Sequence, residues 1–195
     1  MRVIAGSARG RPLKGPPSAA TRPMANKIKG SLFSMLASLG VEPIRVLDLY
    51  AGTGGIGIEA LSRGAEWVDF VERNAAASAV IRANIATAGF TEAARVHQLP
   101  VASFLNRAEP AYDFIILDPP YADPEIVRVL TRLGSTPLVQ SDTIVAIGHS
   151  PRAILPERAG KLIRFRQRCH GDSCYSLYEM ERDLVDNANG EDQPA

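Results

Sequence analysis

The chain has 195 residues, of which 46% are hydrophobic, so it is long enough to enclose one hydrophobic core. No apolar run reaches the ~18 residues of a membrane-spanning helix, and the first residues lack the apolar segment of a secretory signal. These features argue against a membrane protein, and we expect a cytoplasmic monomer. The net charge of +1 is not that of a uniformly basic or acidic protein.

The charge is distributed unevenly along the chain. The first acidic residue is Glu42, so residues 1–41 carry seven basic side chains and no acidic one, whereas the remainder carries 15 basic and 21 acidic residues. An acid-free basic segment suits a polyanion, because Lys and Arg release condensed counterions from phosphates. A solvated basic face is the structural alternative. The candidate nucleic-acid-binding residues are Arg2, Arg9, Arg11, Lys14, Arg22, Lys27 and Lys29.

The amino-terminal segment predicts two small elements. Residues 2–14 indicate a basic β-hairpin with glycine at its turns. Apolar residues at helical spacing predict a helix from Ala25 to Ser38, with Lys27 and Lys29 on its polar side and Gly40 ending it.

Beyond Pro43 short apolar strands alternate with helices. Strands are predicted at 45–50, 67–72, 94–98, 114–117 and 143–147, and helices at 55–63, 75–88, 101–107 and 124–133. This alternation is typical of a Rossmann-like α/β fold with helices on both faces of a parallel sheet. Residues 162–168 and 175–181 predict a terminal antiparallel pair, which makes a seven-stranded, mostly parallel sheet.

We therefore divide the chain into three segments. Residues 1–40 form a basic hairpin and helix extension that docks on nucleic acid, and residues 41–182 form the α/β domain. Residues 183–195 are polar and acidic and predict a disordered tail. The two cysteines, Cys169 and Cys174, lack the spacing of common zinc sites, so we expect a reduced structural pair and no metal.

A glycine-rich loop follows the first strand of the α/β domain. Residues 52–57, GTGGIG, satisfy G-x-G-x-x-G between a predicted strand and a helix, where the backbone comes close to a ligand. Asp48 and Glu72 lie at the ends of the first and second strands, where a carboxylate accepts ribose hydroxyls. These residues indicate a nucleoside cofactor, and both a nicotinamide dinucleotide and S-adenosylmethionine (SAM) fit.

The strand 114–117 ends on Asp118-Pro119-Pro120-Tyr121. The prolines end strand pairing and leave their carbonyl groups free as acceptors. Asp118 and the Pro119 carbonyl can accept both hydrogens of an exocyclic base amine while Tyr121 stacks on the base. A strand cap with a core tyrosine is the structural alternative.

Such a corner suits methyl transfer to nitrogen. The lone pair of an aryl amine is delocalised into its ring, which makes it a poor nucleophile toward a methyl sulfonium. Two acceptors favour a more tetrahedral nitrogen in the transition state. The corner therefore indicates a SAM-dependent amino-methyltransferase.

Residues 1 to about 181 resemble the RsmD family within the class I SAM-dependent amino-methyltransferases. The resemblance rests on RVIAGSARGRPL, RPMANKIKGSLFSML, LDLYAGTGGIGIEALSRGA, DPPY and GDSCYSLYE. It implies methylation of N2 of a guanine in 16S ribosomal RNA, within the small ribosomal subunit or a late precursor, and RNA contacts from the basic extension. It implies target-amine contacts from Asp118, Pro119 and Tyr121. The implied SAM contacts are Asp48, Ala51, Gly52, Thr53, Gly54, Glu72 and Val101.

Three positions depart from the family pattern. Met24 replaces a usual threonine, Gly30 a usual glutamate, and Pro100 an Asp or Asn that bonds the adenine amine. Adenine binding should then rely on backbone and apolar contacts.

Other readings stay open. A dehydrogenase accepts the glycine loop and Glu72 but leaves the DPPY corner unused. DNA adenine-N6 methylation fits the same corner, and a non-catalytic RNA-binding assembly factor fits the three departures. The late arginines Arg164, Arg166 and Arg168 are an alternative RNA surface.

Overall fold

The computed structural model describes residues 1–15, 26–107, 111–120 and 125–181, and for residues 26–28 it describes the backbone only. Tyr121, Arg22, Met24, the predicted tail and the side chain of Lys27 therefore lie outside the described residues. Within these ranges no helix is long and apolar enough to cross a membrane.

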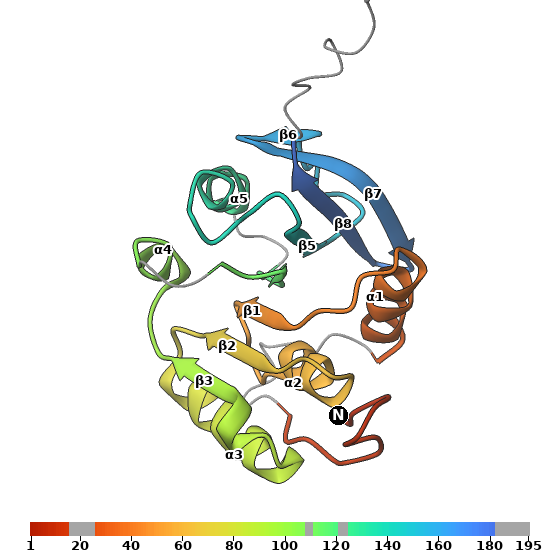
Figure 1. Cartoon of the computed structure of the whole chain (residues 1–195), viewed down its shortest axis with the longest axis vertical. Helices are drawn as coiled ribbons and strands as arrows, with labels where there is room; N and C mark the ends of the chain where they lie inside the picture. The colour runs from red at the N-terminus through yellow and green to blue at the C-terminus, as the bar shows by residue number, and fades with distance from the viewer. Residues whose placement is uncertain (16–25, 108–110, 121–124, 182–195) are drawn as a thin grey trace, which may run out of the picture.

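The described strands form one twisted sheet in the order β3-β2-β1-β4-β5-β8-β7-β6 (Figure 1). Neighbours from β3 to β5 pair in parallel, and β8, β7 and β6 pair antiparallel. The strand bounds are β1 Arg45–Leu49, β2 Trp67–Val71, β3 Ala94–His97, β4 Phe114–Leu117, β5 Ile144–His149, β6 Arg158–Ala159, β7 Leu162–His170 and β8 Ser173–Met180.

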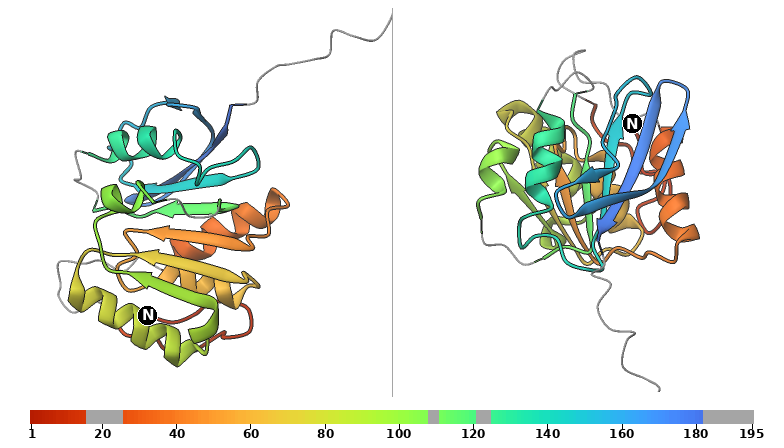
Figure 2. Two further views of the ribbon diagram at one scale, coloured as in Figure 1. Left: turned by 60° about the vertical axis from the view of Figure 1, so that its left-hand side comes forward. Right: turned by 90° about the horizontal axis from the view of Figure 1, so that it is seen from above.

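Helices cover both faces of the sheet (Figures 1 and 2). The bounds are α1 Asn26–Ser38, α2 Gly55–Ser62, α3 Ala75–Ala88, α4 Val101–Phe104 and α5 Ile126–Leu133, with a 3-10 turn at Thr91–Ala93. One apolar core joins α1, α2 and α3 to one face, and a second joins α4 and α5 to the other. Alternate residues of β1 show this division, because Val46 lies in the first core and Leu47 in the second.

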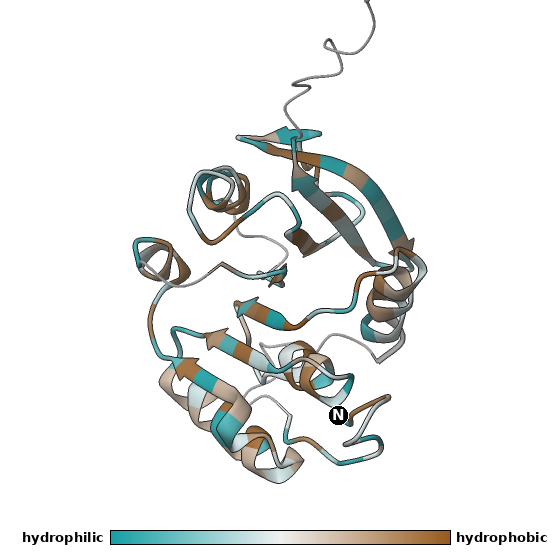
Figure 3. Ribbon diagram, in the orientation of Figure 1, coloured by the Kyte–Doolittle hydropathy of each residue, from teal (hydrophilic) through white to brown (hydrophobic). Residues whose placement is uncertain are grey.

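The predicted mostly parallel, Rossmann-like sheet is confirmed, and its strand count is corrected from seven to eight within the described residues. The added strand is β6, whose two residues pair with Leu162 and Ile163. A strand of two residues carries no readable alternation, so its pairing with β7 alone defines it. Figure 3 shows the hydrophobic colouring concentrated along the central strands.

The amino-terminal hairpin is less regular than expected. Its backbone pairs through one bridge between Arg2 and Pro12, with the amide of Val3 donating to the carbonyl of Arg11. Other backbone groups of this segment bond to a different element, as when the amide of Ser7 donates to the carbonyl of Ser62 at the end of α2. Val3 and Leu13 are buried in the same core as α1 and α2.

Candidate active site

The glycine loop and Asp118 meet at the carboxyl edge of the parallel strands. β4 pairs with β1, and the amide of Asp118 donates to the carbonyl of Leu49 at 3.3 Å. Asp118 therefore lies beside the end of the first strand of the α/β domain, where the glycine loop begins. Tyr50 has a φ of 59°, a left-handed conformation that non-glycine residues rarely adopt and that often marks a functional turn.

Glycine is required where the loop enters α2. Gly54 precedes the helix with a φ of 78°, and a Cβ there would lie 3.2 Å from Ile81 and 3.3 Å from Phe70. The loop therefore packs against β2 and α3 without room for a side chain. The side chain of Asn84 adds a bond from α3 to the carbonyl of Thr53 at 2.9 Å and accepts from the amide of Lys14 at 2.7 Å. Asn84 is a positioning residue that the sequence pattern did not reveal.

Glu72 anchors the glycine loop to the end of β2. Its carboxylate accepts from the amide of Gly52 at 3.0 Å and from the amide of Asn74 at 2.8 Å. A carboxylate has about four acceptor positions. Two of them therefore remain for hydroxyl groups such as those of a ribose, in agreement with the expected role of Glu72.

Asp48 carries a buried carboxylate oxygen that lacks a hydrogen-bond partner among the described residues. Its Oδ2 accepts from the amide of Gly57 at 2.9 Å, whereas Oδ1 is buried and unpaired. Burial, together with the charges of Asp118 and Glu72, raises the pKa of Asp48 to about 7, although the Gly57 amide opposes the shift. An unpaired buried acceptor among negative groups suits a cation, and SAM carries two cationic groups.

Asp118 occupies a space that depends on a glycine in β5. A Cβ built on Gly148 would lie 2.6 Å from Oδ1 of Asp118 and 3.3 Å from Cε1 of Tyr175. Burial raises the pKa of Asp118 to about 7. Gly148 and Tyr175 therefore form the wall beside this carboxylate. Gly148 belongs to none of the sequence motifs named above, and strand register brings both residues here.

The remaining predicted cofactor and target residues fall around this edge. Ala51, Thr53, Val101 and Pro119 are buried, and the amide of Ala51 donates to the carbonyl of Val71 at 3.1 Å. Val101 belongs to the apolar core on the α4 and α5 side. Pro100, which replaces an expected adenine ligand, caps the amino terminus of α4.

The position of Lys29 corrects one expectation. Its side chain is 1% exposed rather than on a polar face, and its Nζ lies 3.0 Å from Oε2 of Glu59, which is also buried. The same ammonium donates to the carbonyl of Arg2 at 3.2 Å. Lys29 is therefore a structural cation that joins α1, α2 and the amino-terminal segment, and we remove it from the RNA-binding set.

The other amino-terminal cations that the structure describes, Arg2, Arg9, Arg11 and Lys14, do not form one patch. Arg9 and Arg11 lie near the carboxyl ends of α2 and α3, at the opposite edge of the sheet from Asp118. Arg11 donates to the carbonyl of Thr87 in the last turn of α3 at 2.8 Å. Arg2 and Lys14 are exposed, and Lys14 is the one held near the glycine loop by Asn84.

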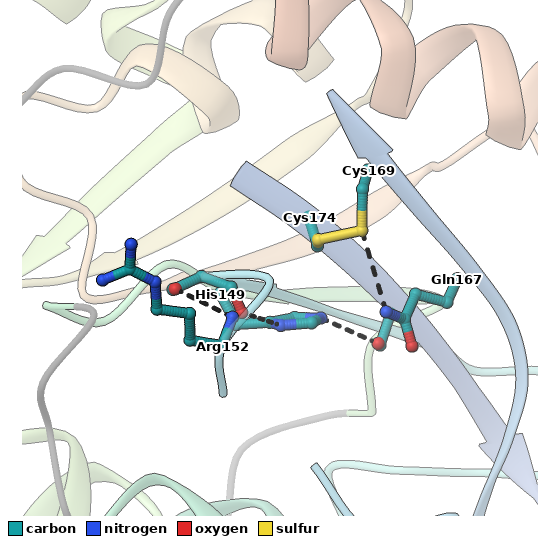
Figure 4. The surroundings of a disulfide bond; sticks show 7 residues. His149, Arg152, Gln167, Cys169 and Cys174 are labelled. Atoms are coloured by element: carbon teal, nitrogen blue, oxygen red, sulfur yellow. Dashed lines mark hydrogen bonds between the residues drawn. A yellow bond between two sulfur atoms is a disulfide. The ribbon is translucent and has the colours of Figure 1, made fainter. Parts of the chain in front are cut away.

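The cysteines also differ from expectation, because the predicted reduced pair is a disulfide between Cys169 and Cys174 (Figure 4). The two residues are directly opposed in the β7–β8 ladder, with Cα atoms 4.0 Å apart. Sequence spacing did not show this opposition, because it depends on the hairpin register.

His149, at the end of β5, lies close to the disulfide in Figure 4. Its Nδ1 donates to the carbonyl of Ser150 at 2.9 Å, and its Nε2 accepts from the hydroxyl of Ser176 at 2.9 Å. Burial lowers the pKa of His149. These contacts hold the end of β5 against Ser176 of β8.

Comparisons with known proteins cover nearly the whole chain. A family model described as "Conserved hypothetical protein 95" matches residues 1–179. The YlbH protein of Bacillus subtilis is 36% identical over 182 residues, which are 92% of this chain and 98% of that protein. "Ribosomal RNA small subunit methyltransferase D" of Escherichia coli is 29% identical over 181 residues, 93% of this chain and 90% of that protein.

Solved structures are similar to the same extent. A hypothetical protein of Thermus thermophilus has a TM-score of 0.80 and 30% identity, over 92% of this chain and 99% of that one. The Escherichia coli yhhF protein has a TM-score of 0.80 and 28% identity, over 93% of this chain and 98% of that one.

Proposed function

Because the chain belongs to the RsmD family of methyltransferases, we propose that it methylates the exocyclic N2 amine of a guanine in 16S ribosomal RNA. Methylation of ribosomal RNA with SAM as the methyl donor follows from the family. The guanine amine, the small-subunit substrate and the residue roles are our proposal. The observation that carries them is the meeting of Asp48, Glu72 and Asp118 at one edge of the sheet.

The donor residues fit SAM. Glu72 would hold the ribose hydroxyls with its remaining acceptor positions, and the unpaired oxygen of Asp48 would accept from a cationic group. Ala51, Gly52, Thr53, Gly54 and Val101 would supply backbone and apolar contacts. When bound, SAM supplies a methyl group on an electrophilic sulfonium.

The target amine would be held by Asp118 and the carbonyl of Pro119, with Tyr121 stacked on the base. Two acceptors draw the amine hydrogens away from the base plane and localise the nitrogen lone pair, an effect that is largest in the transition state. The nitrogen gains the methyl group and then loses one proton, to Asp118 or to water. A carboxylate whose pKa is raised to about 7 is well matched to receive that proton near neutral pH.

The basic residues of the amino-terminal segment are the proposed RNA contacts. Arg2, Arg9, Arg11, Lys14, Arg22 and Lys27 remain proposed contacts to the RNA backbone. The described basic residues lie near both ends of the parallel strands, and this distribution suits a large, folded RNA rather than one short strand.

A mapped methylation assay tests this function. Labelled SAM is incubated with wild-type protein and unmodified 16S rRNA, small subunits lacking the modification, or duplex DNA, and the modified base is identified by mass spectrometry. We expect N2-methylguanine in the RNA or the particles and no label in DNA. Label on adenine N6 of DNA, or no label on any substrate, would overturn the proposal in favour of a DNA enzyme or a non-catalytic binding factor, respectively.

A further inference from the structure

Four residues form a row across four neighbouring strands. Leu117 pairs with Ile147, which places Asp118 beside Gly148, and Gly148 pairs with Tyr175. Tyr175 in turn pairs with Arg168 of β7. Three strand spacings of about 4.8 Å place the Arg168 backbone ~14 Å from that of Asp118. The row therefore leads from the proposed amine site to an arginine on the last long strand.

The side chains of this row lie on one face of the sheet. Tyr175 and Leu177 belong to the core beneath α1 and α2. Their partners in β7 are Arg168 and Arg166, and directly opposed residues of an antiparallel pair project to the same side. Asp118 lies on this side as well, because a Cβ built on Gly148 would meet both its carboxylate and the Tyr175 ring.

Most of β7 is a free, basic sheet edge. β6 pairs only with Leu162 and Ile163, and residues 165–170 are all exposed. No acidic residue occurs between Lys161 and Gly171. Within the described part of the chain, no hydrogen bond or ion pair engages the side chain of Arg166 or Arg168. Figure 3 shows β7 coloured mainly as hydrophilic.

Arg164 does not belong to this surface. A register shift separates it from Arg166, and it pairs with Tyr178, which lies in the core of the opposite face. Its guanidinium donates to the carbonyl of Leu155 at 3.2 Å and lies 3.9 Å from Glu157. Arg164 is thus engaged within the protein, whereas Arg166 and Arg168 are available to a ligand.

The tip of the hairpin is held in place from two sides. The disulfide joins Cys169 to Cys174 across the ladder (Figure 4), and the hydroxyl of Ser31 in α1 is hydrogen-bonded to Nε2 of His170 at 2.9 Å. Figures 1 and 2 both show the end of β7 beside α1. These ties reduce the conformational entropy that Arg166 and Arg168 would lose when they bind.

We propose that the exposed face of β7, through Arg166 and Arg168, binds phosphates of the single-stranded RNA that flanks the target guanine. This inference rests on the proposed function and names the surface that guides the substrate into its site. Unpaired guanidinium groups on a strand that contains no acidic residue complement a phosphate backbone. A base that is taken out of its stack and enters the Asp118 site brings its flanking phosphates to the carboxyl ends of the parallel strands. Arg168 lies at the same level, because it is in the row that contains Asp118.

The test compares two double variants of equal charge change. Arg166→Gln/Arg168→Gln alters the proposed surface, and Arg82→Gln/Arg95→Gln removes two exposed arginines from α3 and β3 at the other end of the sheet. Filter binding of unmodified 16S rRNA is measured over a range of NaCl concentrations, together with steady-state methylation at varied RNA concentration and SAM binding.

We expect the first variant to lose about 1.4 units of salt slope, at ~0.7 for each single-strand phosphate contact. Its KM for RNA should rise severalfold, whereas its kcat at saturating RNA and its SAM affinity stay at wild-type values. The control variant should keep the wild-type slope.

An unchanged slope in the Arg166/Arg168 variant, or an equal change in the control, would overturn the inference while wild-type methylation upholds the proposed function. If the wild type methylates no RNA but the two variants differ in slope as expected, the RNA surface stands and the proposed function fails. A wild type that binds no RNA would contradict both this inference and the proposed function.

Discussion

Asp118 differs from a surface carboxylate in both position and chemistry. Its side chain lies against Gly148, which leaves no room for a Cβ, and burial raises its pKa to about 7. The ionised form accepts hydrogen bonds from an amine, whereas the protonated form has lost part of that capacity. The proposed binding of the target amine should therefore depend on the protonation state of Asp118 near neutral pH.

The variant Asp118→Asn tests this role because it keeps the shape and removes the charge. We expect kcat to fall by ~10²-fold, about 2.7 kcal/mol in the barrier, with SAM affinity near the wild-type value. In the wild type, the rate at saturating SAM should decrease as the pH falls below about 7, because Asp118 becomes protonated. This decrease should be weaker in the variant, in which Asp48 is the remaining carboxyl group of the site with a pKa raised to about 7.

Single-turnover rates and calorimetric SAM titrations between about pH 5.5 and 8.5, roughly 1.5 units either side of neutrality, measure both effects. The matched control is Asp142→Asn, an exposed aspartate before β5 at the opposite edge of the sheet. Equal losses of kcat and SAM affinity in Asp118→Asn would mean that the residue holds the cofactor or the fold rather than the amine.

At the scale of elements, one buried ion pair joins three segments of the chain. Glu59 of α2 binds Lys29 of α1 and accepts from the amides of Ile4 and Ala5 at 2.8 and 3.0 Å. Burial raises the pKa of Glu59, but the Ile4 amide and the Lys29 ammonium outweigh burial and hold that pKa below its ordinary value. Burial lowers the pKa of Lys29 despite the nearby carboxylate.

Replacing Glu59 should destabilise the contact between α1, α2 and the amino-terminal segment. Glu59→Gln leaves Lys29 buried without an opposite charge, and we expect a loss of about 3 kcal/mol in the free energy of unfolding. In the wild type, the stabilisation from Glu59 should be present above pH 4.5, its ordinary pKa, and be lost as the pH falls below that value. Urea denaturation at several pH values measures both.

Glu66→Gln provides the control for this experiment, because Glu66 is exposed just after α2. A loss in Glu59→Gln no larger than that in the control would show that the ion pair adds nothing to stability. The loss measured for Glu59→Gln also includes the attachment of the amino-terminal segment, because the amides of Ile4 and Ala5 lose a charged acceptor in the same variant.

At the scale of the whole molecule, ligand binding should couple to folding. The proposed SAM contacts lie on β1, in the loop between β1 and α2, directly after β2 and on α4, so a bound cofactor stabilises the sheet that connects these elements. At 100 times the dissociation constant, SAM should add about 2.7 kcal/mol to the free energy of unfolding. For a chain of this length that corresponds to a rise of ~5–10 °C in Tm.

Differential scanning fluorimetry with SAM, and with NAD as the comparison, measures this shift. We expect no rise with NAD. Stabilisation by NAD and not by SAM would contradict the methyl-donor assignment and revive the dehydrogenase reading, which accepts the same glycine loop and Glu72.

Local patterns in the chain determined much of this molecule. Strand–helix alternation predicted the parallel sheet and its helices to within a few residues, because hydrophobic period depends on near neighbours. The glycine loop, Glu72 and Asp118 follow strand ends, and the carboxyl ends of parallel strands meet at one edge, so their meeting was also predictable.

Tertiary structure alone decided the features that depend on pairing between distant segments. Lys29 has the spacing of a surface residue in the sequence, but it is buried in an ion pair with Glu59 in the folded protein. Gly148 and Arg168 belong to no local motif, and strand register brings them into line with Asp118. The opposition of Cys169 and Cys174 has the same origin. Register and burial are properties of two segments together, so neither segment encodes them by its own pattern.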